Sequence, residues 1–404
     1  MSTTSPPTPR RATITDVARE AGTGKTSISR YLNGEMGALS PELRARIEAA
    51  IARLDYQPNQ MARGLKRGRN RLIGMLLADL TNPYTVEVLQ GVEAACHALG
   101  LMPLICHAAN EVEMERRYLQ LLTTYRVEGV IVNALGVREG SLRPVGGSGI
   151  PVVLVDRLVE GLVADMVGLD NRGAVELGTR HLLDQGFDDI WFVVQPFEQV
   201  SSRQLREAAF REVMRAHARE RGERGTREEG ERGAREQGVA RRGDSPRAVR
   251  GQTLVLDLAD SEQIARSLAV LDRAIDDAGR KGGGEGDEAD GTYLGGADSI
   301  ATHATNATNV PRIALFAANA PVALCLALHL KARYGAGWQA RVALLSIDDP
   351  EWAELAGITT IRQPTGEIGY RAVEFLHERI EGREASARDC LLPGELIVRA
   401  STSR

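Results

Sequence analysis

Apolar runs of strand length alternate with amphipathic helical stretches from about residue 71 to the end of the chain. The first of them read RLIGMLLADL, PYTVEVLQGVEAACHAL, MPLICHAA, EVEMERRYLQLLTTYR and VEGVIVNAL. A buried strand, a helix and a second buried strand form a βαβ unit, which requires a parallel sheet covered on both faces. These units are too many for one sheet, so we predict an α/β protein with two doubly wound parallel-sheet lobes and a cleft between them.

Two segments interrupt this alternation. Residues 218–244 combine Arg, Glu and Gly with almost no apolar side chains, and residues 279–309 are rich in Gly, Asp, Ala and Thr. Such compositions bury too little apolar surface to offset the entropy of ordering the chain. We therefore expect both segments to be long, disordered insertions in one lobe.

The N-terminal part of the chain has a different pattern. Residues 13–33 read as two short helices joined by a turn around Gly22, and Ser40 followed by Pro41 starts a third helix over about residues 42–54. Two short helices joined by a tight turn form a helix-turn-helix, whose second helix enters the DNA major groove. Residues 13–58 are therefore predicted to be an all-α DNA-binding domain, preceded by a disordered arm over residues 1–12.

The charge of the chain is divided at the same place. The 404 residues carry a formal net charge of −4, yet residues 1–72 contain thirteen Lys and Arg against six Asp and Glu. A basic head on an acidic body is typical of a polyanion-binding domain attached to a regulatory domain, because phosphate neutralisation supplies most non-specific DNA affinity. Without the helix-turn-helix beside it, a solvated basic face would be the alternative interpretation.

Polar residues stand where several of the predicted strands end. Ligands bind at the carboxyl edge of the strands in open α/β sheets, so these positions are candidates for a small-molecule site in the cleft. Each alone is more often a cap or turn residue, but their recurrence at one edge favours a binding site. They are Asp79, Asn82, Asn133, Asp156, Arg157, Asn319, Asp348 and Asp349, with Arg206 as the cation for an anionic ligand.

No catalytic motif is convincing. The stretch GTGKTS at residues 22–27 lacks the first glycine and the preceding strand of a phosphate-binding loop. Ser202, His181 and Asp170 have no nucleophile-elbow pattern around the serine. We therefore expect no enzymatic activity, no cofactor and no metal. Because no apolar run reaches the about eighteen residues of a membrane span and no signal peptide is recognisable, we expect a cytoplasmic protein without a membrane partner.

Six stretches distributed along the chain carry a family resemblance. They are ITDVAREAG, SISRYLN, LDYQPNQMARGLKRGRNRLIGM, LVDR, LDNRG and ITTIRQP. Together they resemble the lactose-repressor (LacI/GalR) family of transcriptional regulators, over nearly the whole chain from residue 13 apart from the two insertions. The resemblance implies a hinge helix and linker over residues 59–70 and an effector-binding and dimerisation core over residues 71–404. In this division the first lobe covers about 71–160 and 358–385, and the second covers about 161–357 and 386–404.

The resemblance implies DNA contacts in the head and in the hinge. Lys25 and Thr26 match the base-reading pair of the recognition helix, and Leu65 matches the hinge leucine that wedges into the minor groove and kinks the DNA. The turn usually reads Val-Ser where this chain has Thr23-Gly24, which removes a helix N-cap and a phosphate-contacting hydroxyl. The implied DNA-binding residues are Thr15, Lys25, Thr26, Ser27, Ser29, Arg30, Asn33, Tyr56, Asn59, Ala62 and Leu65.

The resemblance also implies an effector site in the cleft. The stretches KTSISRYLNGE, DYQPNQMARGLKRGR, DDPEW and QPFEQVSSRQLREAAF look most like regulators that respond to 2-ketogluconate, with Arg206 as the candidate for its carboxylate. The residue after Asn319 is commonly Asp but is Ala320 here, so a contact made there is absent. The implied effector-binding residues are Asn82, Tyr84, Asn133, Asp156, Arg206, Asn319 and Asp348.

These features predict a cytoplasmic, homodimeric repressor that binds a pseudo-palindromic, double-stranded operator and is released by a small sugar or sugar-acid effector. An activator, or a regulator whose ligand tightens the DNA complex, fits the same residues. The other class is a sugar-binding protein or an enzyme on the same fold. The basic head argues against that class, as does the lack of a nucleophile, metal cluster or phosphate loop.

Overall fold

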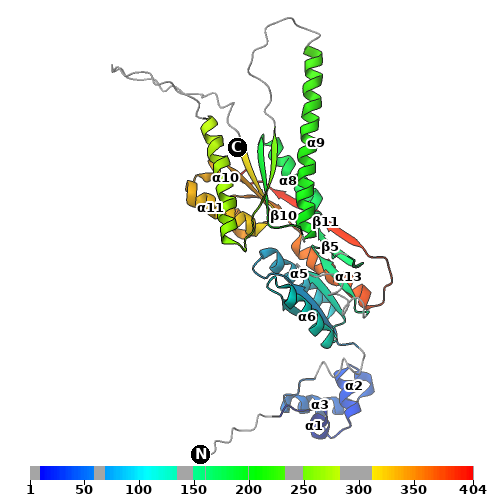
Figure 1. Ribbon diagram of the computed structural model, residues 1–404. Helices are drawn as coiled ribbons and strands as arrows, with labels where there is room; N and C mark the ends of the chain where they lie inside the picture. The colour runs from blue at the N-terminus through cyan, green and yellow to red at the C-terminus, as the bar shows by residue number, and fades with distance from the viewer. Residues whose placement is uncertain are drawn as a thin grey trace, which may run out of the picture. The chain divides into compact units, whose positions relative to one another are not determined.

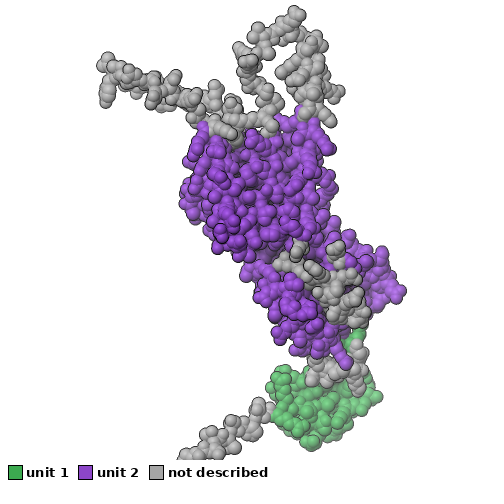
Figure 2. Space-filling view, viewed as in Figure 1, with its two compact units in different colours: residues 1–71 green, residues 72–404 purple. Residues whose placement is uncertain are grey.

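The computed structural model describes residues 10–58, 69–133, 149–159, 161–198, 200–232, 249–282 and 312–403. The chain forms two compact units, residues 1–71 and residues 72–404 (Figure 2). The hinge expected over residues 59–70, with Asn59, Ala62 and Leu65, lies outside the described residues except for its last two positions, and so does most of the expected arm. No helix in the described part of the chain is long and apolar enough to cross a bilayer.

The first unit is the three-helix head that the sequence predicts. Thr13 caps its first helix through a capping box with Asp16, and the Ser40 hydroxyl accepts a hydrogen bond from the Leu43 amide at 3.2 Å to start the third helix. Val17, Ile28 and Ile47 are fully buried between the helices. The helices are α1 (Ile14–Glu20), α2 (Lys25–Leu32) and α3 (Pro41–Arg53), with a 3₁₀ turn at Met36–Ala38.

One long-range contact fixes the turn between α1 and α2. Gly22 has a φ of +59°, a conformation that side chains disfavour, and a Cβ there would also lie only 2.5 Å from the Arg46 guanidinium. Arg46 reaches from α3 and donates hydrogen bonds to the carbonyl oxygens of Ala21, at 2.5 Å, and Gly22, at 2.9 Å. The third helix therefore holds the C-terminal end of α1 and the turn that leads into α2.

The second unit contains two six-stranded sheets, one in each lobe. The first has the order β11-β5-β4-β3-β1-β2 and is parallel throughout. The second has the order β12-β10-β9-β8-β6-β7 and is parallel except for its edge strand β12. The first-sheet strands are β1 (Leu72–Leu77), β2 (Met102–His107), β3 (Gly129–Asn133), β4 (Val152–Val155), β5 (Asp165–Leu169) and β11 (Asp389–Leu392). The second-sheet strands are β6 (Asp189–Val194), β7 (Arg250–Val255), β8 (Ile313–Ala317), β9 (Ala343–Ile347), β10 (Thr359–Arg362) and β12 (Glu395–Ile397).

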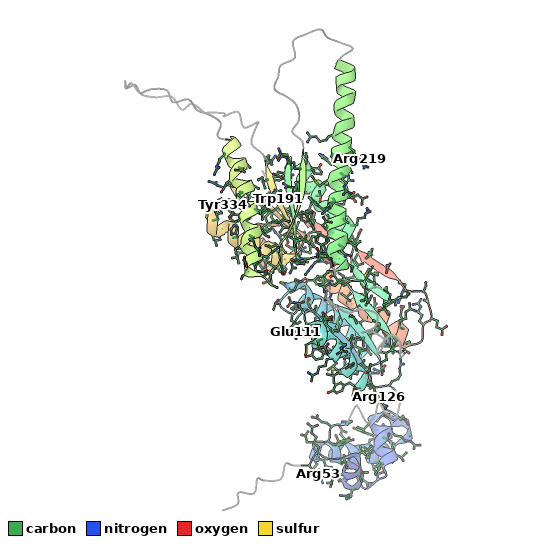
Figure 3. All side chains as sticks on the ribbon, in the orientation of Figure 1. Arg53, Glu111, Arg126, Trp191, Arg219 and Tyr334 are labelled. Carbon is green, nitrogen blue, oxygen red and sulfur yellow. The ribbon has the colours of Figure 1, made fainter. Side chains whose placement is uncertain are left out.

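Helices cover both faces of each sheet, and apolar cores fill the space between (Figure 1). In the first lobe, α5 and α13 pack so closely that a Cβ on Gly369 would lie 2.0 Å from the Val88 carbonyl oxygen. In the second lobe, Trp191 on β6 belongs to the core beneath α10 and α11 (Figure 3). The first-lobe helices are α5 (Pro83–Leu99), α6 (Val112–Thr124) and α13 (Thr365–Ile380). The second-lobe helices are α8 (Asn171–Asp184), α9 (Ser201–Arg232), α10 (Ser261–Gly282), α11 (Ala320–Tyr334) and α12 (Glu351–Leu355), with a 3₁₀ turn at Trp338–Ala340.

The chain passes between the lobes at other residues than the sequence predicts. Residues 161–169 and 386–392 belong to the first lobe, because β5 and β11 pair in its sheet, whereas residues 358–362 belong to the second lobe through β10. The two strands assigned to the wrong lobe, β5 and β11, are short. β5 also begins with Asp165, a buried charged residue, whereas a buried strand is expected to consist of apolar residues. Three crossovers therefore connect the lobes, after β5, after β10 and after β11.

The expectation that residues 218–244 form a disordered loop is wrong for residues 218–232. These residues continue α9, which extends away from the second lobe (Figure 1). Adding a residue to an existing helix avoids the cost of nucleation, and Arg and Glu are good helix formers. The helix α10 likewise runs to Gly282, so residues 279–282 are helical, and the rest of both segments up to residues 248 and 311 lies outside the described residues.

Candidate functional site

Most predicted DNA-binding residues of the head lie on α2 or at its C-terminal end, whereas Thr15 lies on α1 and Tyr56 follows α3. Ser29 and Arg30 stand three and four residues after Thr26, and Asn33 stands four and three residues after them, which places the four residues on one face, while Ile28 is buried on the other. Lys25 opens the helix next to this face. Of the predicted set in the described head, Thr15, Lys25, Thr26 and Arg30 are exposed, and Ser27, Ser29, Asn33 and Tyr56 are half-buried.

The start of α2 is uncapped by any side chain, as the departure at Thr23-Gly24 predicts. Gly24 occupies the N-cap position with an extended backbone and makes no side-chain hydrogen bond to the helix. A Cβ at Gly24 would meet no atom within 4 Å, so the position has room for a hydroxyl-bearing residue. The Ser27 amide donates to the Gly24 carbonyl oxygen at 3.0 Å, so the Lys25 and Thr26 amides are the first-turn groups available to another acceptor, such as a phosphate oxygen.

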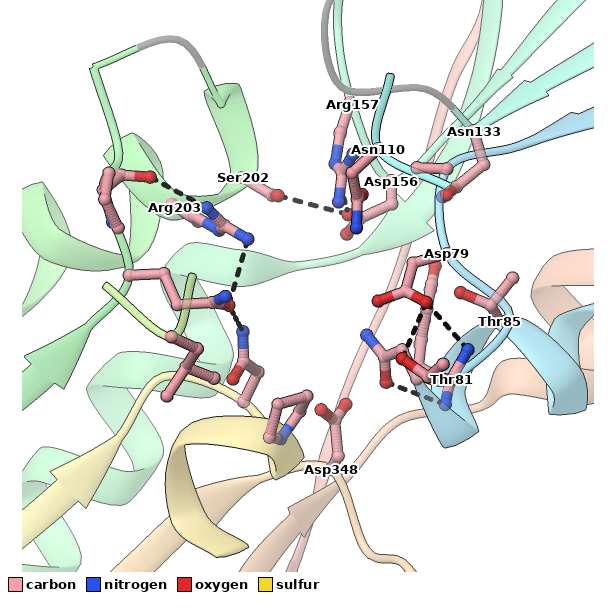
Figure 4. A pocket seen from close by; sticks show the side chains of 18 of the residues that line it. Asp79, Thr81, Thr85, Asn110, Asn133, Asp156, Arg157, Ser202, Arg203 and Asp348 are labelled. Atoms are coloured by element: carbon pink, nitrogen blue, oxygen red, sulfur yellow. Dashed lines mark hydrogen bonds and ion pairs between the residues drawn. The ribbon is translucent and has the colours of Figure 1, made fainter. Parts of the chain in front are cut away.

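All seven predicted effector residues line one cavity between the two lobes (Figure 4). Its volume is about 510 Å³, inside the range of roughly 300–1,000 Å³ that is usual for small-molecule sites. Asp79 and Arg157 also line it, but Asp349 does not. The Asp349 carboxylate instead forms ion pairs with Arg399, at 2.6 Å, and Arg362, at 2.7 Å. The predicted residues that line the cavity are Asn82, Tyr84, Asn133, Asp156, Arg206, Asn319 and Asp348.

Two asparagines of this set are held in place by helix capping. Asn82 caps α5, where its side chain accepts a hydrogen bond from the Tyr84 amide at 3.2 Å. Asn319 caps α11 through the Val322 amide at 3.1 Å, while its side-chain nitrogen donates to Gln195 at 2.8 Å. The Asn319 amide is thus engaged on both sides, whereas capping fixes only the oxygen side of the Asn82 amide.

Arg206 is buried and already engaged by the protein. Its Nε donates to the Asn171 side chain and its Nη1 to the Ala318 carbonyl oxygen, both at 2.6 Å. Its Nη2 lies 3.8 Å from the Asp156 carboxylate. Arg206 therefore connects the first crossover and the end of β8 to the first lobe, which the sequence does not show.

Direct hydrogen bonds connect the lobes beside the cavity. The Ser202 hydroxyl on α9 donates to the Asp156 carboxylate at 3.1 Å (Figure 4). The neighbouring Ser201 hydroxyl accepts from the Leu158 amide at 2.9 Å. The first turn of α9 therefore holds the segment after β4, and any change in the angle between the lobes must alter these two bonds.

Several buried polar atoms at this cavity have no hydrogen-bond partner among the described residues. They are the Tyr84 hydroxyl, Asp156 Oδ1, Gln363 Oε1, and Nε and Nη1 of Arg157. Burial, together with the nearby carboxylates of Asp156 and Asp348, raises the pKa of Tyr84 well above its ordinary value, so the phenol is a neutral donor. Buried donors and acceptors without partners are costly, so this set is suited to a polar ligand.

Sequence reasoning missed several polar residues of the cavity: Thr81, Thr85, Asn110, Gln195, Ser202, Arg203, Asp257 and Gln363. Arg203 stands one helical turn before Arg206, a spacing that places both on one face of α9, so periodicity could have found it. Gln363 follows β10 directly and donates to Asp348 at 2.5 Å, so the strand-end rule that found Asp348 also applies to it. Ser202 was considered only as a nucleophile, a role that its bond to Asp156 does not support.

Comparison with known families identifies both units. Residues 13–59 match the family model described as bacterial regulatory proteins, lacI family. Residues 70–224 match periplasmic binding proteins and sugar binding domain of LacI family, and residues 231–402 match a periplasmic binding protein-like domain. The HTH-type transcriptional regulator PtxS of Pseudomonas aeruginosa is 38% identical over 398 residues, which cover 98% of this chain and 97% of that protein. This chain belongs to the lacI family of bacterial regulatory proteins.

Further similarities agree with this assignment. The HTH-type transcriptional regulator KdgR of Bacillus subtilis is 29% identical over 96% of this chain and 97% of that protein. A crystal structure of the lac repressor dimer bound to operator and the anti-inducer ONPF matches with a TM-score of 0.70 at 20% identity, covering 97% of this chain and 99% of that one. The lacI-family fold, with a helix-turn-helix head and two parallel-sheet lobes, is thus shared along the whole length. The protein is a DNA-binding transcription regulator.

Proposed function

We propose that this regulator is a homodimeric repressor that is released from its operator when a sugar or sugar acid, 2-ketogluconate in the first instance, occupies the cleft. The observation that carries the proposal is the cavity itself. Seven residues chosen from sequence line it together, and several of its lining residues carry buried polar atoms that have no hydrogen-bond partner among the described residues. A hydroxyl-rich ligand fits such a lining, because each hydroxyl donates and accepts.

Two heads would read the two halves of a pseudo-palindromic site. In this arrangement Lys25 and Thr26 contact base edges in the major groove, while Thr15, Ser27, Ser29, Arg30, Asn33 and Tyr56 contribute further base or phosphate contacts. Asn59, Ala62 and Leu65 of the two hinges would meet in the central minor groove, where Leu65 unstacks a base step.

Effector binding would act through the angle between the lobes. The bonds of Ser201 and Ser202 to the segment after β4 are the contacts that such a movement changes. A coupling free energy of about 1–3 kcal/mol between cleft and hinge suffices to change DNA affinity severalfold to a hundredfold. Order in the hinge is then the two-state element that the effector biases.

The test is a gel shift of the purified protein on DNA flanking its own gene, with 2-ketogluconate, gluconate or glucose added. We expect release by 2-ketogluconate and a protein-to-DNA ratio of two protomers per operator by sedimentation. Tighter binding to the operator with 2-ketogluconate would show instead that the ligand acts as a corepressor. Binding that is indifferent to all three compounds would reject the proposed effectors, and no shift at all would contradict operator recognition by the Thr23-Gly24 head.

A further inference from the structure

We propose that Arg10 and Arg11, which lead into the first helix of the head, bind phosphates of duplex DNA and add affinity that does not depend on sequence. The partner is any double-stranded DNA, whether operator or not. The proposal rests on the DNA contacts proposed above for Thr15, Lys25 and Arg30, but it is independent of the effector. Neither arginine belongs to the DNA-binding set that the family resemblance implies.

The cations of the head divide into those that the fold uses and those that it leaves free. Residues 10–58 contain eight of them. Arg19 and Arg53 form ion pairs with acids of α1, and Arg44 and Arg46 donate to backbone carbonyl oxygens. Within the described head, the remaining cations are exposed and form neither an ion pair nor a side-chain hydrogen bond: Arg10, Arg11, Lys25 and Arg30.

This division indicates a function, because two of the four free cations are DNA contacts in the arrangement proposed above. Lys25 opens α2, and Arg30 lies on its outer face. An exposed cation adds little to the stability of a fold, whereas a cation that contacts a phosphate releases a condensed counterion and so strengthens DNA binding. By the same criterion, Arg10 and Arg11 are phosphate ligands.

The capping box of α1 fixes the point from which the two arginines extend. The Thr13 amide and hydroxyl both donate to Asp16 Oδ2, at 2.9 and 2.6 Å. Arg11 precedes this point by two residues, about 7 Å of extended chain at most, and Thr15 follows it by two. Thr15 is exposed and is one of the proposed DNA contacts. Both arginines therefore begin beside a part of the head that lies against DNA in this arrangement.

Asp16 attracts Arg10 but does not hold it. Hydrogen bonds from Thr13 are the largest cause that lowers the pKa of Asp16, and the positive charges of Arg10 and Arg19 have smaller effects. Oδ2 of Asp16 is occupied by Thr13, and Oδ1 lies 3.6 Å from Arg19. A phosphate oxygen that approaches Arg10 therefore has no ion pair to break among the described residues.

The test measures how DNA affinity depends on salt. Each phosphate contact contributes about −0.9 to the slope of log K against log salt concentration, so Arg10→Gln/Arg11→Gln should reduce the slope by about 1.8 for each bound head. The ratio of wild-type to variant affinity should then shrink about 12-fold for each bound head between roughly 50 and 200 mM salt. Fluorescence anisotropy of the full-length protein measures the affinity, on DNA flanking its own gene and on a shuffled duplex of the same composition.

Two further double variants separate a phosphate contact from a general effect of charge. Arg19→Gln/Arg53→Gln is the matched control, because it removes the same charge from exposed positions of the same head that are paired with acids. Its slope should change by less than about 0.5. Arg10→Lys/Arg11→Lys should keep the wild-type slope, since a phosphate contact requires charge rather than a planar guanidinium. In every variant the ratio of the affinities for the two duplexes should stay within about twofold of wild type, because phosphate contacts carry no sequence information.

A Gln variant with the slope of the wild type would overturn the proposal, and so would a control that loses as much slope as the Gln variant. A Lys variant that loses as much slope as the Gln variant would overturn the assignment to phosphates. Thermal unfolding should be the same for all four proteins, and a less stable Gln variant would show that the fold uses the two arginines after all. A wild type without preference for the DNA flanking its own gene would contradict the proposed operator recognition, but the slopes on the shuffled duplex would still test the arginines.

Discussion

Asp156 and Asp348 occupy equivalent positions in the two lobes. Each follows the fourth strand of its sheet in chain order, each has a left-handed backbone with φ of 67° and 77°, and the amide of each donates to the adjacent strand at 3.0 Å. Their side chains differ. Both Asp348 oxygens accept hydrogen bonds, from the Ala320 amide and from Gln363, whereas Asp156 Oδ1 accepts none among the described residues. Asp156 is thus the carboxylate with capacity left for a ligand.

Asp156→Asn should weaken effector binding by roughly tenfold, because an amide loses attraction for Arg157 and Arg206 and cannot accept at both of its ends. Asn tolerates the left-handed backbone, so the fold should be kept. Operator affinity without ligand should stay the same, since the change lies in the cleft. Calorimetry and gel shift measure the two quantities, and an unchanged effector affinity would remove Asp156 from the site. Asp79→Asn, on the cavity wall and bonded to Thr81, is the comparison variant.

Asp165→Asn should destabilise the core by about 3 kcal/mol, the usual cost of breaking a buried ion pair. The Asp165 carboxylate is fully buried and accepts from Arg379 at 2.8 and 2.9 Å and from the Arg388 side chain at 3.0 Å. These bonds join the start of β5 to the end of α13 and the approach to β11. Thermal unfolding followed by circular dichroism checks the loss. Glu113→Gln, which breaks an exposed pair with Arg116, should have little effect.

The same cluster should make stability depend on pH. Burial alone raises the pKa of Asp165, but the hydrogen bonds from Arg379 and Arg388 outweigh it and hold the pKa well below the usual range. A carboxyl group of this kind stabilises the fold at pH values above its unfolded pKa of about 3.9, and the stabilisation is lost as the pH falls below that. The difference in melting temperature between wild type and Asp165→Asn should be constant from pH 7 to about pH 5 and shrink below about pH 4. A difference that grows on acidification would contradict this assignment.

Arg46→Met should destabilise the head by about 1.5 kcal/mol, because two carbonyl oxygens at the end of α1 lose a charged donor. Operator affinity should fall with it, while effector binding in the cleft should be unaffected. Arg53→Met, on the same helix, breaks only an ion pair with Glu20 and should cost less. Each substitution is made alone in the full-length protein. Thermal unfolding then measures its stability, and fluorescence anisotropy measures its affinity for operator DNA. Equal losses of stability in both variants would show that the contact of Arg46 with the turn contributes no more than the exposed ion pair of Arg53.

Deleting residues 218–244 should leave folding and operator binding intact. Phe210 and Met214 are buried against the second sheet, whereas residues 218–221 of α9 are exposed. The part of the deleted segment whose side chains the structure describes therefore contributes little packed surface. Yield of soluble protein and a gel shift test this expectation, with Met214→Ala as a variant that should destabilise the lobe. An insoluble deletion protein would show that the distal part of α9 has a folding role.

Sequence predicted what depends on local pattern. Asn133 and Asp348 were found because a parallel sheet places the residues after its strands at one edge, whatever the partners are. The partners themselves depend on residues distant in sequence: Arg206 bonds to Asn171 and to Ala318, 35 and 112 positions away. β5 was missed for the same reason, since Asp165 is buried only because Arg379 and Arg388 arrive more than 200 residues later. The periodicity of apolar residues along the chain does not reveal that distant arginines compensate a buried carboxylate.

The length of α9 turns a small rotation into a large displacement. The helix begins at the cavity with Ser202, and Arg219 lies 17 residues further along it, a distance of about 25 Å, so each degree of rotation moves that end by about 0.4 Å. A spin label or fluorophore attached at position 219 would therefore undergo a large displacement when the helix rotates by a small angle about the ligand site. Paired with a second label on α6, it would report lobe rotation during titration in solution, without touching a residue that binds DNA or ligand.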